Sequence, residues 1–203
     1  MDTAQWLNGL PDELPVGNIN LPGTHNSAAI DPGRRTLHAC QNFSIGEQLR
    51  AGIRLLDVRL KVLGAVRGKI FLYNRLNDDP LLGVPVRWAT DTAGSAAEYH
   101  GERAYEVWIQ DRYNDFSPHP RRAKLRWIIA AFTKKTPENV VLNFASGTWF
   151  GVFGVYVMDE LSQFLRAWRP GHFGWILFDY PFGLPGRSRS QPDVVATIIR
   201  SNF

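Results

Sequence analysis

Two apolar runs that each end in ionisable residues constrain the fold of this 203-residue chain more than any other feature. The run at 16–21 stops at Pro-Gly, and His25 follows, so we expect a strand whose carboxyl end carries an imidazole. In the second run, at 52–60, Asp57 and Arg59 alternate with aliphatic side chains and should share one face of a strand. Parallel α/β folds place their sites at the carboxyl ends of strands, so the sequence predicts one shared site there.

Strand and helix patterns alternate along the rest of the chain. A Ser-x-x-Glu capping box at Ser44 predicts a short helix ending near Ala51. The segment 6–14 is expected to be a helix or lid under a barrel floor, and 77–101 a surface loop with an extended piece at 84–88. We expect strands at about 16–22, 53–62, 69–73, 105–110, 139–144 and 174–178, and further helices at 120–135, 155–168 and 192–201.

The connection after the second strand is too short for a regular barrel. Only six residues, 63–68, separate that strand from the next one, whereas a parallel crossover needs a dozen or more. Closed (β/α)8 barrels use about 250 residues and at least about 200. With about six strands, the sequence predicts a single α/β domain over 1–203, an incomplete or distorted barrel of this type, with an apparent internal deletion near 63–66.

Several motifs along the chain are similar to those of one enzyme family. They are Leu-Pro-Gly-Thr-His-Asn-Ser at 21–27, Gln41 with Ser-Ile-Gly-Glu-Gln-Leu at 44–49, Gly-Ile-Arg-Leu-Leu-Asp-Val-Arg at 52–59, Arg-Gly-Lys-Ile-Phe-Leu at 67–72, Val-Trp-Ile-Gln-Asp-Arg-Tyr at 107–113, Val-Leu-Asn-Phe at 141–144, Gly-Trp-Ile-Leu-Phe-Asp-Tyr at 174–180 and Ile-Ile-Arg-Ser-Asn at 198–202. In this order they resemble the phosphatidylinositol-specific phospholipase C family in its bacterial, metal-independent form. The resemblance implies a phospholipase C-like phosphodiesterase TIM barrel that lacks the strand 3–4 region.

The resemblance also implies a reaction and its residues. Attack by the inositol 2-hydroxyl on phosphatidylinositol gives diacylglycerol and inositol cyclic phosphate. The matched positions make His25 the general base, oriented by Asp179, and Arg59 the group that binds the phosphate, with Asp57 positioning this group and the acid.

Three further matched positions are implied to bind the inositol ring: Arg75, Asp111 and Tyr113. A carboxylate and a guanidinium can hold ring hydroxyls while a tyrosine stacks on the ring. The alternative is that these residues are only structural. Asp111 would then form a surface ion pair with Arg112, Tyr113 would pack at the edge of the core, and Arg75 would be a charged loop residue.

No metal or other cofactor is expected. Arg59 stands where calcium-dependent relatives would have a carboxylate ligand. Asn26 follows the first histidine as it does in the metal-dependent relatives, but a lone Asn is a weak ligand.

The general acid is the weak point of the resemblance. The family supplies it as a second His in a His-Gly pair after strand three, the region that this chain lacks. The His-Gly pair at 100–101 lies at the wrong place in the motif order for that role. Losing a general acid costs about 10²–10⁴-fold in rate. Two alternatives to an active enzyme therefore stay open: a catalytically impaired phosphoinositide- or inositol-phosphate-binding relic, or a truncated product of a longer enzyme.

The expected partner is phosphatidylinositol or a related inositol phospholipid at a membrane surface. The net charge of +4 suits such a surface, although it equally fits a solvated basic face, and no basic run indicates nucleic acid. Trp149 and Phe150 could form a membrane-facing rim or simply pack a loop. No signal peptide or membrane-spanning segment is recognised, so we expect a cytoplasmic or peripheral location, although relatives are often secreted. The oligomeric state is left open.

Overall fold

The structure is a computed structural model. It describes residues 2–31, 39–57, 73–74, 84–85, 88, 92–98, 106–113, 119–147, 152–168, 171–183 and 194–203.

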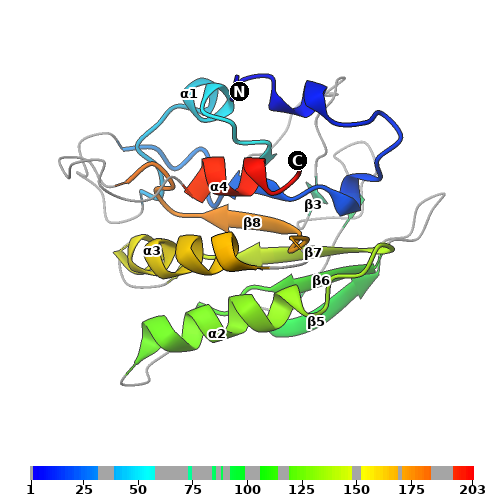
Figure 1. Ribbon diagram of the computed structural model, residues 1–203. Helices are drawn as coiled ribbons and strands as arrows, with labels where there is room; N and C mark the ends of the chain where they lie inside the picture. The colour runs from blue at the N-terminus through cyan, green and yellow to red at the C-terminus, as the bar shows by residue number, and fades with distance from the viewer. Residues whose placement is uncertain are drawn as a thin grey trace.

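A mixed six-stranded sheet forms the centre of the fold (Figure 1). Its strands, in spatial order, are β2 (Leu55–Leu56), β1 (Leu21–Thr24), β8 (Trp175–Phe178), β7 (Asn139–Phe144), β6 (Glu106–Gln110) and β5 (Ala93–Glu98). The first five are parallel, and β5 is antiparallel to β6. A separate parallel pair joins β3 (Tyr73–Asn74) to β4 (Val84–Pro85). None of the described strands connects β2 to β5, so the described sheet is open and the prediction of an incomplete α/β barrel is confirmed.

Helices cover the sheet as the alternating pattern predicted. The described helices are η1 (Trp6–Gly9), η2 (Val16–Asn18), α1 (Ile45–Arg50), α2 (Pro120–Phe132), α3 (Val152–Ala167) and α4 (Val194–Arg200). Figure 1 shows α2, α3 and α4 side by side across one face of the sheet. The capping box is confirmed, because Ser44 accepts from the Glu47 backbone while the Glu47 side chain accepts from the Ser44 backbone. Among the described helices, none combines the length and apolar composition needed to cross a bilayer.

Three sequence expectations need correction or fall outside the description. Residues 16–18 form the 3-10 helix η2, closed by hydrogen bonds from the Asn18 N–H to the Pro15 carbonyl (2.8 Å) and from the Ile19 N–H to the Val16 carbonyl (3.2 Å), and the strand begins only at Leu21. The expected loop 77–101 contains strand β5, whose small residues give no hydrophobic alternation and which forms through its ladder with β6. The predicted strand 53–62 is described as far as Asp57 and contains β2, whereas only Tyr73 of the predicted strand 69–73 is described.

The core lies around the central strands. Every residue of β7 and β8 is buried, which explains their continuous apolar runs, since parallel strands covered on both faces show no alternation. Trp6 is also buried, and its Nε1 donates to the Gly52 carbonyl oxygen at 2.9 Å, just before β2. The opening segment therefore packs at the amino end of the sheet, as expected of a floor element.

A buried asparagine holds the amino end of β1 in place. Asn20 is 1% exposed, and its side chain bonds to two segments that flank β8 and α4. Its partners are the Gly171 carbonyl (2.7 Å), the Ser201 hydroxyl (2.9 Å) and the backbone N–H groups of Phe173 (2.9 Å) and Gly174 (3.1 Å). These bonds set the height of β1 beside β8, and hence the position of the residues at the carboxyl ends of both strands.

Candidate functional site

Three site residues follow three adjacent strands in register. Thr24, the last residue of β1, pairs with Leu56 of β2 and with Phe178 of β8. The next residues along the chain are His25, Asp57 and Asp179. Because the strands are parallel and in register, these three residues must emerge together at the carboxyl end of the sheet.

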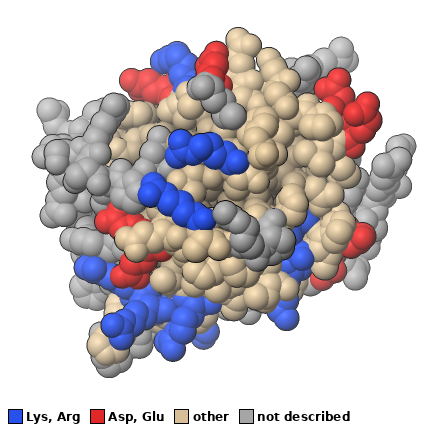
Figure 2. Space-filling view, in the orientation of Figure 1, with Lys and Arg blue, Asp and Glu red and all other residues tan. Residues whose placement is uncertain are grey.

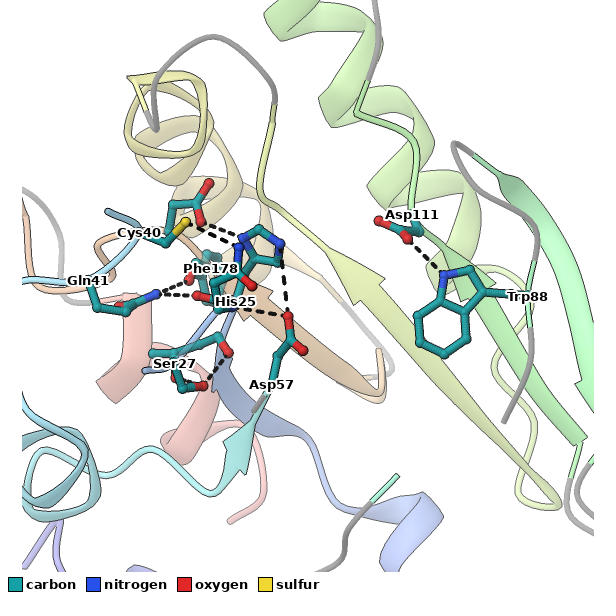
Figure 3. Close-up of polar contacts among 11 residues, drawn as sticks. His25, Ser27, Cys40, Gln41, Asp57, Trp88, Asp111 and Phe178 are labelled. Atoms are coloured by element: carbon teal, nitrogen blue, oxygen red, sulfur yellow. Dashed lines mark hydrogen bonds and ion pairs between the residues drawn. The ribbon is translucent and has the colours of Figure 1, made fainter. Parts of the chain in front are cut away.

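The backbone of His25 is tied to β8. Its N–H donates to the Phe178 carbonyl at 2.9 Å. Gln41, which is 1% exposed, donates from Nε2 to the carbonyls of His25 (2.7 Å) and Phe178 (3.0 Å), as Figure 3 shows. The side-chain amide of Gln41 thus links the carboxyl ends of β1 and β8 and restrains the backbone of His25.

The imidazole of His25 lies between two carboxylates. Its Nδ1 is 2.8 Å from Oδ1 of Asp179, and its Nε2 is 3.9 Å from Oδ2 of Asp57 (Figure 3). Oδ2 of Asp57 also accepts from the Asn26 backbone N–H at 3.0 Å, which fixes its orientation. The expectation that His25, Asp57 and Asp179 share one site agrees with this geometry.

Both burial and charge act on the proton of His25. Burial lowers the pKa of His25, but the hydrogen bond and charge of Asp179, a hydrogen bond with Cys40 and the charge of Asp57 together outweigh it. The pKa therefore rises from its ordinary 6.5 to about 10. At neutral pH the imidazole of the ligand-free protein carries a proton.

An aromatic wall extends from His25 to Asp111. The ring of Phe144, at the end of β7, meets the imidazole edge-on at 6.1 Å, and the Trp88 ring lies 5.9 Å from Phe144. Trp88 in turn donates from Nε1 to Oδ2 of Asp111 at 2.7 Å (Figure 3). Asp111 directly follows β6 and is buried, and Tyr113 lies two residues beyond it and is half-buried. Ring contacts and one hydrogen bond thus connect the carboxyl ends of β1, β7 and β6.

Sequence reasoning did not single out Trp88, Phe144 or Cys40 as site residues. Phe144 ends a strand that was predicted correctly, so its place at the carboxyl end was available as a signal. Trp88 lies in a stretch without periodicity, and no local pattern brings it to Asp111. Cys40 lies in no motif with a recognised spacing, yet it lies beside His25 (Figure 3).

Several residues considered in the sequence lie outside the described residues: Arg59, Arg75, His100, Trp149 and Phe150. Of the histidines in the described part of the chain, only His25 lies among these site residues. His119 precedes α2 and is exposed, and His172 is exposed and lines a cavity with Asn18 and Thr136 at the amino end of the sheet. The described residues therefore supply no second histidine to this site.

Comparison with known proteins identifies solved structures with the same fold. No family model matches the chain. A 1-phosphatidylinositol phosphodiesterase of Listeria monocytogenes is 36% identical over 76 residues, which is 34% of this chain and only 24% of that protein. A phosphatidylinositol-specific phospholipase C structure from Staphylococcus aureus superimposes with a TM-score of 0.78 at 18% identity, covering 100% of this chain and 98% of that one. The phosphatidylinositol-specific phospholipase C structure from Listeria monocytogenes gives a TM-score of 0.68 at 17% identity, with 100% of both chains covered.

The solved structures and the shorter sequence match identify the same group of proteins that the motifs indicated. The chain therefore has the fold of the bacterial phosphatidylinositol-specific phospholipases C, and the resemblance inferred from its sequence is confirmed.

Proposed function

We propose that this chain is a phospholipase C-like phosphodiesterase that cleaves phosphatidylinositol to diacylglycerol and inositol cyclic phosphate. The observation that carries the proposal is the placement of His25 between Asp57 and Asp179 at the ends of three adjacent parallel strands. The fold of the Staphylococcus and Listeria phospholipases C supports the same reaction class.

His25 acts as the base toward the inositol 2-hydroxyl. Asp179 engages Nδ1 at 2.8 Å, which leaves Nε2 as the nitrogen that takes up the hydroxyl proton. The Asp57 oxygen that forms an ion pair with Nε2 is 3.9 Å away, beyond hydrogen-bond distance, so this carboxylate acts on Nε2 through its charge.

His25 carries a proton at neutral pH, and it must lose this proton before it can accept one from the inositol hydroxyl. We assign the phosphate to Arg59, whose guanidinium suits its oxygens. A guanidinium that also pairs with Asp57 would offset the negative charge beside the imidazole and lower the pKa of His25 from about 10. In this proposal Asp57 links phosphate binding to a lower pKa of His25.

We place the inositol ring beside the aromatic wall. Asp111, Arg75 and Tyr113 are assigned to its hydroxyls and face. The carboxylate of Asp111 accepts from Trp88 Nε1 at 2.7 Å, which fixes the orientation of this carboxylate in the proposed ring site.

Because the described residues bring no second histidine to the site, a second candidate function is favoured. An inositol-lipid-binding protein with little or no turnover would keep the same site without an acid for the leaving alkoxide. A single domain over 1–203, with strands 3 and 4 deleted near 63–66, stays part of the proposal, as does the alternative of a truncated gene product.

Basic residues on α2 suit a peripheral membrane contact. Figure 2 shows Lys and Arg side chains gathered where Figure 1 places α2, which carries the exposed Arg121, Arg122 and Arg126. α2 follows β6 and so begins at the carboxyl end of the sheet, on the side of His25. A basic residue near an anionic bilayer contributes about 1 kcal/mol, so Arg121→Ala with Arg122→Ala should weaken vesicle binding roughly tenfold to thirtyfold in co-sedimentation at low salt. Arg200→Ala, at the far end of α4, is the matched control, and equal losses in both variants would contradict this orientation.

Release of inositol cyclic phosphate from phosphatidylinositol vesicles, without and then with calcium, tests the function. The matched variants are His25→Ala and His119→Ala, which removes an exposed histidine. Calcium-independent turnover that only His25→Ala abolishes is the expected result. Folded protein that binds these vesicles without turnover would support the binding function instead. Absence of both binding and turnover from folded protein would refute both.

A further inference from the structure

Cys40 brings a sulfur atom into the proposed catalytic pair. The ligand atoms of His25, Cys40 and Asp179 all lie within 4.8 Å of one another. Figure 3 shows the Cys40 side chain directed toward the imidazole of His25 and the carboxylate beside it. The Asn26 side-chain amide donates to the same sulfur at 3.5 Å. Thiol, imidazole and carboxylate thus converge from three separate segments of the chain.

Backbone bonds hold Cys40 in this place. Its N–H donates to the Ala29 carbonyl at 2.9 Å, and its carbonyl accepts from the Tyr180 N–H at 2.9 Å. The buried Tyr180 hydroxyl also donates to the Ala39 carbonyl at 2.5 Å. Because Tyr180 is the residue after Asp179, these bonds join the cysteine segment to the end of β8. The cluster is therefore a fixed arrangement, and Cys40 within it is only half-buried.

These three ligand types suit one class of metal ion. Thiolate and imidazole select zinc and similar thiophilic ions, whereas calcium and magnesium prefer oxygen ligands alone. Zinc bond lengths of about 2.0 Å to nitrogen and oxygen and about 2.3 Å to sulfur put tetrahedral ligand atoms about 3.3–3.6 Å apart. The 2.8 Å between Nδ1 of His25 and Oδ1 of Asp179 needs to open by only about half an ångström to reach that spacing.

We propose that His25, Cys40 and Asp179 bind a thiophilic divalent cation, Zn²⁺ above all, and that this ion inhibits the site. Binding replaces the Nδ1–H···Oδ1 bond with two metal bonds, and the Nδ1 proton and the thiol proton pass to solvent. Three protein ligands leave a fourth position for water, so this is an open site and not a closed structural one. Metal binding is independent of the proposed function, whereas inhibition rests on it, because the ion takes the carboxylate contact that orients His25.

Cobalt(II) is the probe for binding, because its thiolate complexes absorb in the near ultraviolet and its tetrahedral complexes absorb in the visible. Titration of the metal-free protein should produce both features. Cys40→Ser should abolish the thiolate band and weaken binding about a hundredfold, since losing even an outer-sphere partner of a metal costs about 10–100-fold. Asp179→Asn should weaken binding to a similar degree, and His119→Ala should leave it unchanged. Circular dichroism shows whether each variant is folded.

Folded protein without a thiolate band at millimolar cobalt would overturn the proposal. An Asp179→Asn variant that binds as tightly as the parent would overturn the assigned ligand set. If phosphodiesterase activity is present, zinc should inhibit it reversibly by chelation. An inactive protein that still shows the Cys40-dependent cobalt spectrum would refute the proposed function while leaving the metal site standing.

Discussion

Replacing Asp179 by asparagine should lower the pKa of His25 by several pH units. Burial works against the charged imidazole, and the hydrogen bond and charge of Asp179 are the main forces that oppose it, with Asp57 a smaller one at 3.9 Å. Without Asp179 the pKa should fall from about 10 to near or below the ordinary 6.5. Each pH unit corresponds to about 1.4 kcal/mol, so the raised pKa stabilises the fold by roughly 5 kcal/mol, at the upper end of the 3–5 kcal/mol typical of breaking a buried pair.

The sign of the pH dependence follows from the raised pKa. The stabilisation by His25 is fully present below about pH 6.5 and is lost as the pH rises through about 10. Asp179→Asn should therefore be much less stable than the parent at pH 6, and the difference should shrink toward pH 10.

Two measurements check this prediction. Imidazole ¹⁵N shifts followed by NMR give the pKa of His25 directly, and urea unfolding at pH 6 and pH 9.5 gives the stability difference. Asp57→Asn is the matched control, because its carboxylate is farther away and should matter less. A His25 pKa that stays above 9 in Asp179→Asn, or that falls further in Asp57→Asn, would refute the reasoning. In a turnover assay Asp179→Asn should also lose roughly 10⁴-fold in rate, as removal of the carboxylate does in other His–carboxylate pairs.

The remaining predictions concern the frame of the site. Asn20→Ala leaves two buried backbone donors without their acceptor and should lower the free energy of unfolding by about 3 kcal/mol in urea denaturation, and an unchanged midpoint would contradict its role. Gly174→Ala, at φ +85°, would place a Cβ 2.5 Å from the Val141 carbonyl oxygen and should cost at least about 2 kcal/mol, visible as a lower Tm. Trp88→Phe removes the donor to Asp111 and should raise KM for phosphatidylinositol about fivefold to a hundredfold with a smaller change in kcat, whereas an unaltered KM would remove that carboxylate from substrate binding.

The core of the site could be anticipated from the sequence because it depends on local features. His25, Asp57 and Asp179 each lie at or near the end of an apolar run, and parallel strands bring such positions to one edge. The helices could be anticipated for the same reason, since capping and period are properties of neighbouring residues. The family resemblance supplied the roles, which no spacing alone could assign.

The parts that could not be anticipated depend on long-range geometry. Cys40 reaches His25 only because Gln41 and Tyr180 tie its segment to β8. Trp88 and β5 come from a stretch whose small and polar residues carry no period, so only pairing with β6 and packing against Phe144 reveal their places. The order of strands in a sheet depends on contacts across the whole chain, so it cannot be predicted from a short stretch of sequence.

The pairing of β1 with β8 also sets the order in which function can arise during synthesis. His25 and its carboxylate partner Asp179 are separated by 154 positions, and β8 is the strand that the ribosome makes last among those described. Until β8 emerges, β1 lacks one neighbour and the imidazole lacks the group that orients it. Contacts of such sequence separation form slowly. A nascent chain can therefore complete α1, α2 and α3 while His25 still lacks its carboxylate partner, and the site forms only after β8 has been made.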